Sequence, residues 1–246
     1  MTSKAAIPTA KDVIRAIKAK ADPVRAVTSA SFFKTGKGHY GEGDIFLGLN
    51  SGTQRIIAKE FAELGLPEIA TLLENKIHDY RSVALSILVT QFARAHKAKN
   101  EKECARIVRF YLAHRKGINS WDLVDGSARY IAGAYLFDHP KERKVLYRLA
   151  RSKNLWDKRI AIISTHYFII QHDLSDSFAI MEILLKDRHD LIHKAVGWML
   201  REVGNRDRTA AEKFLKKHAA TMPRTSLRYA IERFSPAERT FYMKMK

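Results

Sequence analysis

The sequence is almost free of cysteine. Its 246 residues contain a single one, Cys104. One cysteine cannot form an internal disulfide, and without a CxxC pair it cannot provide a cysteine-based zinc site. This usage is typical of a reducing compartment, so we expect a cytoplasmic protein.

Long hydrophobic runs are also missing. No apolar stretch reaches the roughly 18–20 residues that cross a bilayer, and residues 1–20 lack the apolar centre of a secretory signal. Hydrophobic residues still make up 46% of the chain, which is enough for a packed core. We therefore expect no membrane association, a single domain over residues 1–246, and disorder only within residues 1–10.

Common catalytic and nucleotide-binding signatures are absent. The chain has neither GxSxG nor HExxH. The segment 36–52 has six glycines, but no Lys-Ser/Thr pair completes a phosphate-binding loop. We interpret it as a flexible loop leading into a helix that begins near Thr53. His189 and His193 are four residues apart, yet no cysteine lies near them, so we expect surface or interface histidines rather than metal ligands.

Acidic residues are scarce relative to basic ones. There are 44 Lys and Arg against 26 Asp and Glu, a net charge of +18. The excess lies in residues 81–246, with 33 basic and 17 acidic residues, whereas residues 1–80 have 11 and 9. Such a charge attracts polyanions and favours nucleic acid over an acidic membrane surface or an acidic protein.

The alternation typical of strands is not found, and helical spacing of apolar residues dominates. Val83, Ile87 and Phe92 lie near one face of a helix predicted over 81–97. The segment 157–170 is apolar enough to be buried on most sides. The helix predicted over 191–204 ends at Gly204, a common helix stop. The sequence therefore predicts an all-α fold.

The predicted helices recur at a regular interval. Similar segments occupy 79–88, 156–165, 191–200 and 224–234, with 120–136 as an intermediate repeat. A period in the thirties favours HEAT-like helical repeats that stack into a curved α-solenoid with a basic concave face. We expect one basic stripe on that face, although each member could also be an ordinary solvated residue of a first helical turn; its four members are Arg81, Arg159, Lys194 and Arg224.

The stretch "SWDLVD" (120–125) combines a tryptophan with two acids. On a helix, Trp121 and Asp125 are about 40° apart around the axis, whereas Asp122 is about 100° from Trp121 and points elsewhere. An ionised carboxylate beside an aromatic ring suits a cationic ligand or a transition state that gains positive charge. The alternative is a core tryptophan with a surface ion pair.

Several runs together resemble one family. They are "FLGL" (46–49), "SWDLVD" (120–125), "NLWDKRIAII" (154–163), "HKAVGWMLRE" (193–202) and "RTSLRYAIE" (224–232). In this order and spacing they resemble the AlkD-like alkylpurine DNA glycosylases, which are HEAT-like-repeat proteins that repair alkylated DNA. The resemblance extends from about residue 30 to 235.

The resemblance implies roles for individual residues. It makes Asp125 the catalytic aspartate, and it makes Trp121 and Trp198 the two tryptophans that contact the backbone and sugar of the damaged nucleotide. Arg159 matches the arginine at the lesion. We also expect DNA contacts from two basic residues in the fourth run, Lys194 and Arg201.

The N-terminal part departs from the family pattern. Segment 36–44 is longer than in the simplest members, and the pair Phe32–Phe33 stands near where some relatives carry a tyrosine.

The implied activity is that of a monofunctional DNA glycosylase, and the resemblance implies no metal or organic cofactor. It hydrolyses the N-glycosidic bond of cationic N3- or N7-alkylated purines, such as 3-methyladenine and 7-methylguanine, in duplex DNA without base flipping. The resemblance implies a bacterial-type cytoplasmic protein that associates with the nucleoid through DNA, and a monomer suffices for this task. The alternatives are a non-enzymatic HEAT-like protein that binds damaged or branched DNA, and a solenoid scaffold for an acidic protein.

Overall fold

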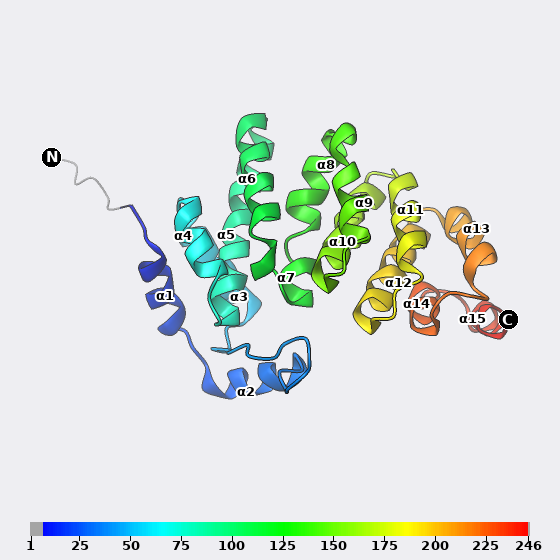
Figure 1. The fold of residues 1–246 in the computed structure, drawn as a ribbon, viewed down its shortest axis with the longest axis horizontal. Helices are drawn as coiled ribbons and strands as arrows, with labels where there is room; N and C mark the ends of the chain where they lie inside the picture. The colour runs from blue at the N-terminus through cyan, green and yellow to red at the C-terminus, as the bar shows by residue number, and fades with distance from the viewer. Residues whose placement is uncertain (1–6, 246) are drawn as a thin grey trace. The chain divides into compact units, whose positions relative to one another are not determined.

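The computed structural model describes residues 7–245 and divides the chain into two compact units, Met1–Ser127 and Ala128–Lys246. Figure 1 shows the helices of both units, and each unit is described by itself below. Of the residues expected to be disordered, 1–6 lie outside the described residues, while Ala10 is buried and begins the first helix. The expectation of a single domain over 1–246 stays a prediction.

Helices make up nearly all of the regular structure. The helices of the first unit are α1 (Ala10–Lys18), α2 (Pro23–Phe32), α3 (Ser51–Glu60), α4 (Leu66–Leu73), α5 (His78–Lys97), α6 (Glu101–Ala113), the 3-10 turn η1 (Arg115–Gly117) and α7 (Trp121–Asp125). Those of the second unit are the π-helical turn η2 (Arg129–Gly133), α8 (Ala134–Asp138), the 3-10 turn η3 (Pro140–Glu142), α9 (Lys144–Ala150), α10 (Leu155–Ile170), α11 (Ser175–Leu184), α12 (Asp190–Gly204), α13 (Arg208–His218), α14 (Arg224–Ala230) and α15 (Pro236–Lys244).

The all-α prediction is confirmed. Between residues 7 and 245 no strand forms, and the β-type pairing found there is an isolated bridge between Ile45 and Ile77. Helix α12 ends at Gly204, as its sequence predicts. The described part of the chain also contains no helix with the length and apolar character needed to span a membrane.

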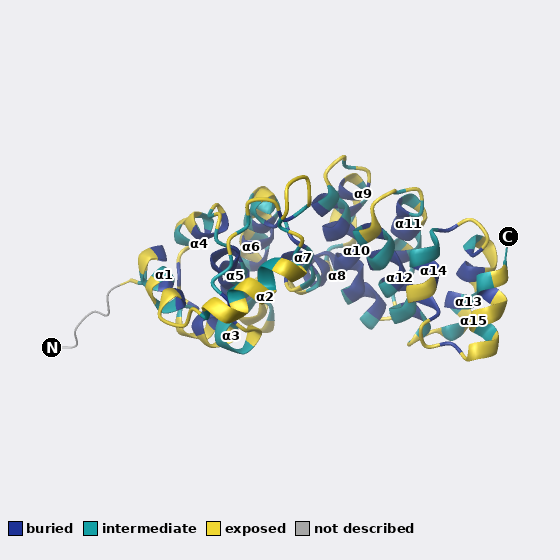
Figure 2. Ribbon diagram, turned by 90° about the horizontal axis from the view of Figure 1, so that it is seen from below, coloured by how far each residue is buried: buried dark blue, intermediate teal, exposed yellow. Residues whose placement is uncertain are grey.

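Helix α5 is the centre of the first unit. Its predicted core residues Val83, Ile87 and Phe92 are all buried, and α3, α4 and α6 pack around it. Helix α2 differs, because none of its residues is buried, and Figure 2 shows it largely exposed. The first unit therefore consists of a packed helical core with an exposed helix that leads to the aromatic pair Phe32–Phe33.

The second unit repeats one packing arrangement. The segments 156–165, 191–200 and 224–234 fall in or around α10, α12 and α14, which pack against one another in succession. Helices α9, α11 and α13 pack beside them. This is the helical-repeat fold that the spacing predicts.

Glycines allow the helices of the second unit to approach closely. A Cβ on Gly197 would lie 2.4 Å from the Ser226 carbonyl oxygen and 2.5 Å from the Tyr229 Cβ. A Cβ on Gly133 would meet Ser164 and Tyr167 in the same way, at 2.4 and 3.0 Å. Distances this short leave no room for a side chain, so glycine is required at both crossings.

Candidate active site

Trp121 and Asp125 lie at the two ends of the short helix α7. Ser120, in an extended conformation, precedes the helix, and Gly126 follows it. Because the two residues are four positions apart, their side chains project from one side of the helix, which confirms the helical arrangement predicted for "SWDLVD". Both side chains are half-buried and remain partly accessible to solvent.

Asp122, the other acid of this stretch, has a structural partner in the first unit. Its Oδ1 lies 3.1 Å from Nε2 of His78, which is 3% exposed. The contact joins α7 to the first turn of α5. Asp122 therefore helps to fix the position of α7, whereas Asp125 lies at the C-terminal end of this helix and is half-buried.

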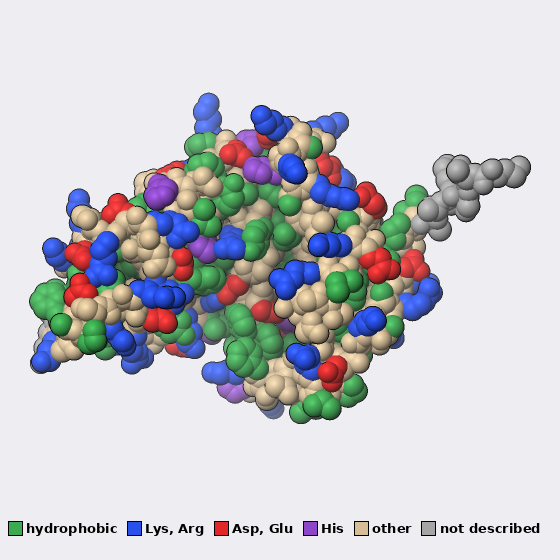
Figure 3. Space-filling model, turned by 180° about the vertical axis from the view of Figure 1, so that it is seen from behind, with side chains coloured by type: hydrophobic (Ala, Val, Ile, Leu, Met, Phe, Trp, Pro, Cys, Tyr) green, Lys and Arg blue, Asp and Glu red, His purple; other side chains and the backbone are tan. Residues whose placement is uncertain are grey.

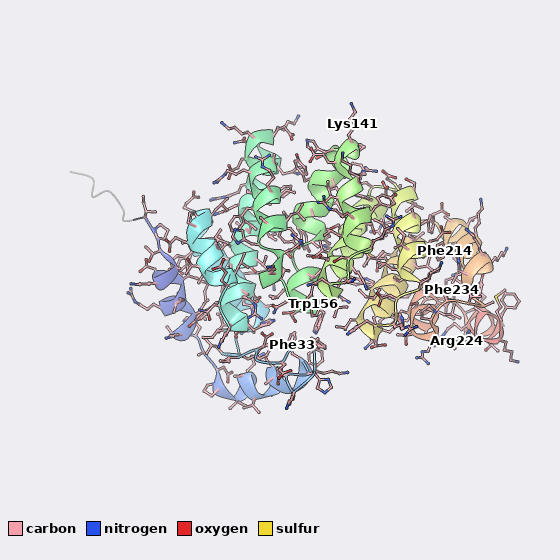
Figure 4. The ribbon with its side chains drawn as sticks, viewed as in Figure 1. Phe33, Lys141, Trp156, Phe214, Arg224 and Phe234 are labelled. Atoms are coloured by element: carbon pink, nitrogen blue, oxygen red, sulfur yellow. The ribbon has the colours of Figure 1, made fainter. Side chains whose placement is uncertain are left out.

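Aromatic rings cover one side of Trp121. The Phe33 ring is stacked on the indole with ring centroids 5.2 Å apart and an interplanar angle of 12°. Phe33 also stacks on Phe46 at 5.0 Å, and Phe46 stacks on His78 at 4.6 Å. Figure 4 labels Phe33 at the end of α2. The cluster of Phe33, Phe46, His78 and Trp121, hereafter the aromatic cluster, fixes the plane of the Trp121 ring.

Phe32 contacts the edge of Trp121 at 5.7 Å and is 67% exposed. The pair at which the sequence departs from the family pattern therefore lies directly on the predicted site residue. Neither residue spacing nor the family resemblance assigned a role to Phe33, Phe46 or His78. The feature that these three residues share in the sequence is an aromatic ring at a position that does not belong to a predicted helical repeat.

A buried tyrosine lies beneath Asp125. Tyr111 of α6 is fully buried, and its hydroxyl lies 3.0 Å from the Ser127 hydroxyl. Burial raises the pKa of Tyr111 far above its usual range, the Asp125 carboxylate raises it further, and the Ser127 hydrogen bond partly opposes both effects. Tyr111 thus stays protonated and supports the segment that carries Asp125.

The glycine-rich segment is fixed at its C-terminal half. The Asp79 carboxylate accepts hydrogen bonds from the backbone amides of Leu47, at 2.6 Å, and Leu49, at 2.9 Å. Gly48 has φ of +82°, and a Cβ there would lie 2.2 Å from the Asp22 carbonyl oxygen. These contacts place Phe46 in the aromatic cluster. The following helix begins at Ser51, close to the predicted Thr53.

In the second unit, Trp198 projects from α12 and is half-buried. Its indole Nε1 donates to Glu202 at 3.2 Å, and its ring contacts the edge of the His166 ring at 5.6 Å. Glu202 is in turn bound by Arg206 at 3.3 Å. Trp198 is therefore held in one orientation by the Glu202 carboxylate, which Arg206 supports from just beyond the end of α12.

His166 is kept neutral in this environment. Burial lowers its pKa to about 4, and the neighbouring cations Arg129 and Arg206 contribute to the shift, while Glu202 opposes it. Arg129 lies 3.2 Å from the imidazole Nδ1, so a neutral ring accepts this hydrogen bond. The Arg129 guanidinium also stacks over the Tyr130 ring at 4.2 Å. The sequence assigned no role to any of these residues except Trp198.

The three predicted basic DNA contacts of the second unit differ in accessibility. Lys194 pairs with Asp190 at 2.8 Å in the first turn of α12, and its side chain is 39% exposed. Arg201 pairs with Glu232 and Glu202 and is 22% exposed. These are surface ion pairs worth about 0–1 kcal/mol, which a phosphate can replace at small cost.

Arg159 is only 5% exposed and donates to the Leu191 carbonyl oxygen at 2.5 Å, which ties α10 to α12. The prediction of an exposed basic stripe is consequently wrong for Arg159 and for Arg81. Arg81 is 3% exposed, pairs with Asp44 at 2.7 Å and donates to the Asn75 carbonyl oxygen at 2.8 Å. A position in the first turn of a helix does not reveal whether a residue is buried. Here the two guanidinium groups are satisfied by the carbonyl oxygens of Asn75 and Leu191 and by the Asp44 carboxylate.

Arg224 likewise donates to the Met243 carbonyl oxygen and joins α14 to α15. On the molecular face seen in Figure 3, Lys and Arg side chains are interspersed with Asp and Glu.

The histidines considered as metal ligands have other roles. His189 accepts from the Leu191 amide at the start of α12, and the His193 Nε2 lies 2.7 Å from the Asp187 carbonyl oxygen. Across residues 7–245, no group of three or more His, Cys, Asp or Glu side chains is arranged to hold a metal ion.

Comparison with known proteins identifies the family and a similar fold. Residues 13–234 match the family model described as DNA alkylation repair enzyme. The fold is similar to that of a solved structure described as a predicted DNA alkylation repair enzyme from Enterococcus faecalis, with a TM-score of 0.69 and 15% sequence identity over 88% of this chain and 98% of that one. A search of curated proteins finds no match. Since the family model covers most of the sequence, the chain belongs to the DNA alkylation repair enzyme family.

Proposed function

We propose that the protein is a DNA glycosylase that removes cationic N3- or N7-alkylated purines from duplex DNA. The observation that carries the proposal is the pairing of Asp125 with Trp121 on α7, where the aromatic cluster fixes the indole and leaves the carboxylate partly exposed. Membership of a DNA alkylation repair family supplies the substrate class.

The chemistry requires one carboxylate and no strong general acid. An alkylated purine already carries positive charge, so the electron pair of the breaking C1′–N bond neutralises the departing base. Positive charge then develops on the deoxyribose, where Asp125 stabilises it and orients the attacking water. The water oxygen bonds to C1′ and its proton passes to solvent. O-glycoside hydrolysis, by contrast, generally needs two carboxyl groups because the leaving group must be protonated.

The tryptophans supply flat surfaces for the sugar. The π face of Trp121 or Trp198 favours a positively charged ring through its quadrupole. Each indole is held by its own contacts, Trp121 by Phe33 and Trp198 by Glu202, so little orientational freedom is lost when DNA binds. In this proposal the indole rings contact the sugar and backbone of the damaged nucleotide, and its base remains stacked in the duplex.

The second unit contributes electrostatic contacts to the phosphate backbone. Lys194 and Arg201 are accessible enough to exchange their surface ion pairs for phosphates. Arg159, which the family resemblance places at the lesion, is buried in this structure, and its contact with DNA requires it to release the Leu191 carbonyl.

We further propose that the enzyme is monofunctional, that it acts as a monomer in the cytoplasm, and that it associates with the nucleoid through DNA. It leaves an abasic site, and no lysine beside Asp125 is assigned to a Schiff base.

The decisive experiment compares wild type with Asp125→Asn on methylated duplex DNA. We expect wild type to release 7-methylguanine and 3-methyladenine and Asp125→Asn to lose at least about 100-fold in rate, the scale of removing one electrostatic contact to a transition state. Asp138→Asn is the matched control, because it makes the same change at an exposed aspartate of α8 that has no role in the proposal.

Equal release by wild type and Asp125→Asn would refute the role of Asp125. DNA binding by a wild-type protein that releases neither base would instead support a non-enzymatic protein that binds damaged DNA.

A further inference from the structure

A groove in the second unit lies between α14 and α15, and none of the predicted site residues lines it. It has a volume of about 500 Å³ and is lined by Arg228, Pro236, Arg239, Thr240, Met243 and Lys244. All but the first come from α15 at intervals of three and four residues, so they form one face of that helix.

The charged lining of this groove is entirely basic. Arg228, Arg239 and Lys244 are exposed, and within residues 7–245 none of them pairs with an acidic side chain. The acid on α15 itself, Glu238, is already bound by Arg208 at 2.6 Å. Three unneutralised cations around one groove produce a local positive potential that favours an anionic ligand.

The walls of the groove are held in place. Arg224 donates to the Met243 carbonyl oxygen, which fixes the end of α15 against the start of α14. The Arg208 guanidinium lies 3.3 Å above the centre of the Phe234 ring while it binds Glu238, which fixes the loop between the two helices. Figure 4 labels Arg224 and Phe234 in this part of the unit. The groove is thus preorganised, so binding costs little conformational entropy.

Helix α14 is the immediate neighbour of α12, which carries Trp198. The Tyr229 side chain packs against Gly197, and Arg201 of α12 pairs with Glu232 just after α14. The groove is consequently one helix further along the repeat from a proposed DNA contact. Tyr229, which adjoins the groove residue Arg228, is 37% exposed.

We infer that this groove binds the phosphodiester backbone of duplex DNA beyond the damaged nucleotide. The inference rests on the proposed function for its DNA partner and adds a separate contact that requires no lesion. Arginine forks match phosphate oxygens, and contacts of this kind fix the register of a protein on DNA without reading sequence. An acidic protein segment is the competing occupant, but such interfaces depend on buried aromatic anchors, and none lines the groove.

The test compares Arg239→Ala/Lys244→Ala with Lys213→Ala/Lys216→Ala. Each pair of substitutions removes two positive charges at exposed positions, the first in the groove and the second on α13. Binding to an undamaged duplex of about three helical turns is followed by fluorescence anisotropy at several salt concentrations. The groove variant is expected to bind more weakly than wild type and to reduce the slope of log K against log salt by about 1.8, about 0.9 for each lost phosphate contact, while the α13 variant keeps the wild-type slope.

Equal salt slopes for the two variants would overturn the inference, and so would a wild-type protein that fails to bind the duplex. Loss of binding to polyglutamate by the groove variant, with its DNA affinity retained, would overturn it in favour of an acidic protein partner. Because the duplex carries no lesion, the measurement does not depend on catalysis. A wild type that binds DNA with the predicted slopes but releases no base contradicts the glycosylase proposal and leaves the groove assignment intact.

Discussion

The neutral state of His166 leads to a pH dependence of stability. The ring is 5% exposed, and its pKa falls from 6.5 to about 4 because burial and the cations Arg129 and Arg206 disfavour a second positive charge, against the opposing Glu202 carboxylate. In the unfolded chain the same group binds its proton near pH 6.5. Lowering the pH therefore favours the unfolded state. The contribution of neutral His166 to stability is complete above about pH 6.5 and is lost progressively as the pH falls toward 4.

The magnitude follows from the size of this change. Each pH unit between the two pKa values corresponds to about 1.4 kcal/mol, so the fall from 6.5 to about 4 sets an upper bound of about 3–4 kcal/mol. Relaxation of Arg129 and entry of water on protonation reduce this bound. We expect the free energy of unfolding to fall by about 1–2 kcal/mol over this interval because of His166.

The assay is urea unfolding followed by circular dichroism near pH 7 and near pH 5, on wild type and His166→Gln. Glutamine keeps an acceptor for Arg129 but does not titrate, so His166→Gln should lose less stability than wild type between the two pH values. His39→Gln, a change at an exposed histidine of the first unit, is the control and should retain the wild-type difference. Identical pH dependence of wild type and His166→Gln would refute the argument that His166 is held neutral.

Two further predictions concern packing. Phe33→Ala removes stacking on Trp121 and Phe46, so we expect the free energy of unfolding in urea to fall by about 2 kcal/mol. Phe32→Ala, at a ring that is 67% exposed, should lower it by less than about 1 kcal/mol. Similar losses for both variants would contradict the assigned role of Phe33. Gly197→Ala forces a Cβ to within 2.5 Å of Tyr229 and should lower the free energy of unfolding by about 1–3 kcal/mol, seen as a lower melting temperature. Gly204→Ala, at the end of the same helix with its nearest atom at 3.5 Å, is the control and should be neutral or stabilising. An unchanged melting temperature for Gly197→Ala would contradict the close packing of α12 on α14.

Much of the fold could be predicted because helix formation depends on local periodicity. Val83, Ile87 and Phe92 are buried on α5 as their spacing predicts, and the repeat period correctly identified the neighbouring helices α10, α12 and α14. The position of Asp125 beside Trp121 follows from the same rule, because residues four apart on a helix share a side.

The burial of charged residues could not be predicted in the same way. Arg81 and Arg159 look like solvated residues of a first helical turn, yet each is buried and donates to a carbonyl oxygen of another segment. The spacing of residues along one helix does not indicate which other segment packs against the end of that helix. The expected stripe of exposed cations failed for that reason.

The helices, their recurrence along the chain and the nearness of Trp121 to Asp125 could all be predicted from residue patterns, because each pattern is local to one helical segment. The stacking of Phe33 on Trp121, the contact of His78 with Asp122 and the contact of His166 with Trp198 became visible only once the helices were packed together. Those contacts join helices distant in the chain, where packing and the need to satisfy buried polar groups select the partners.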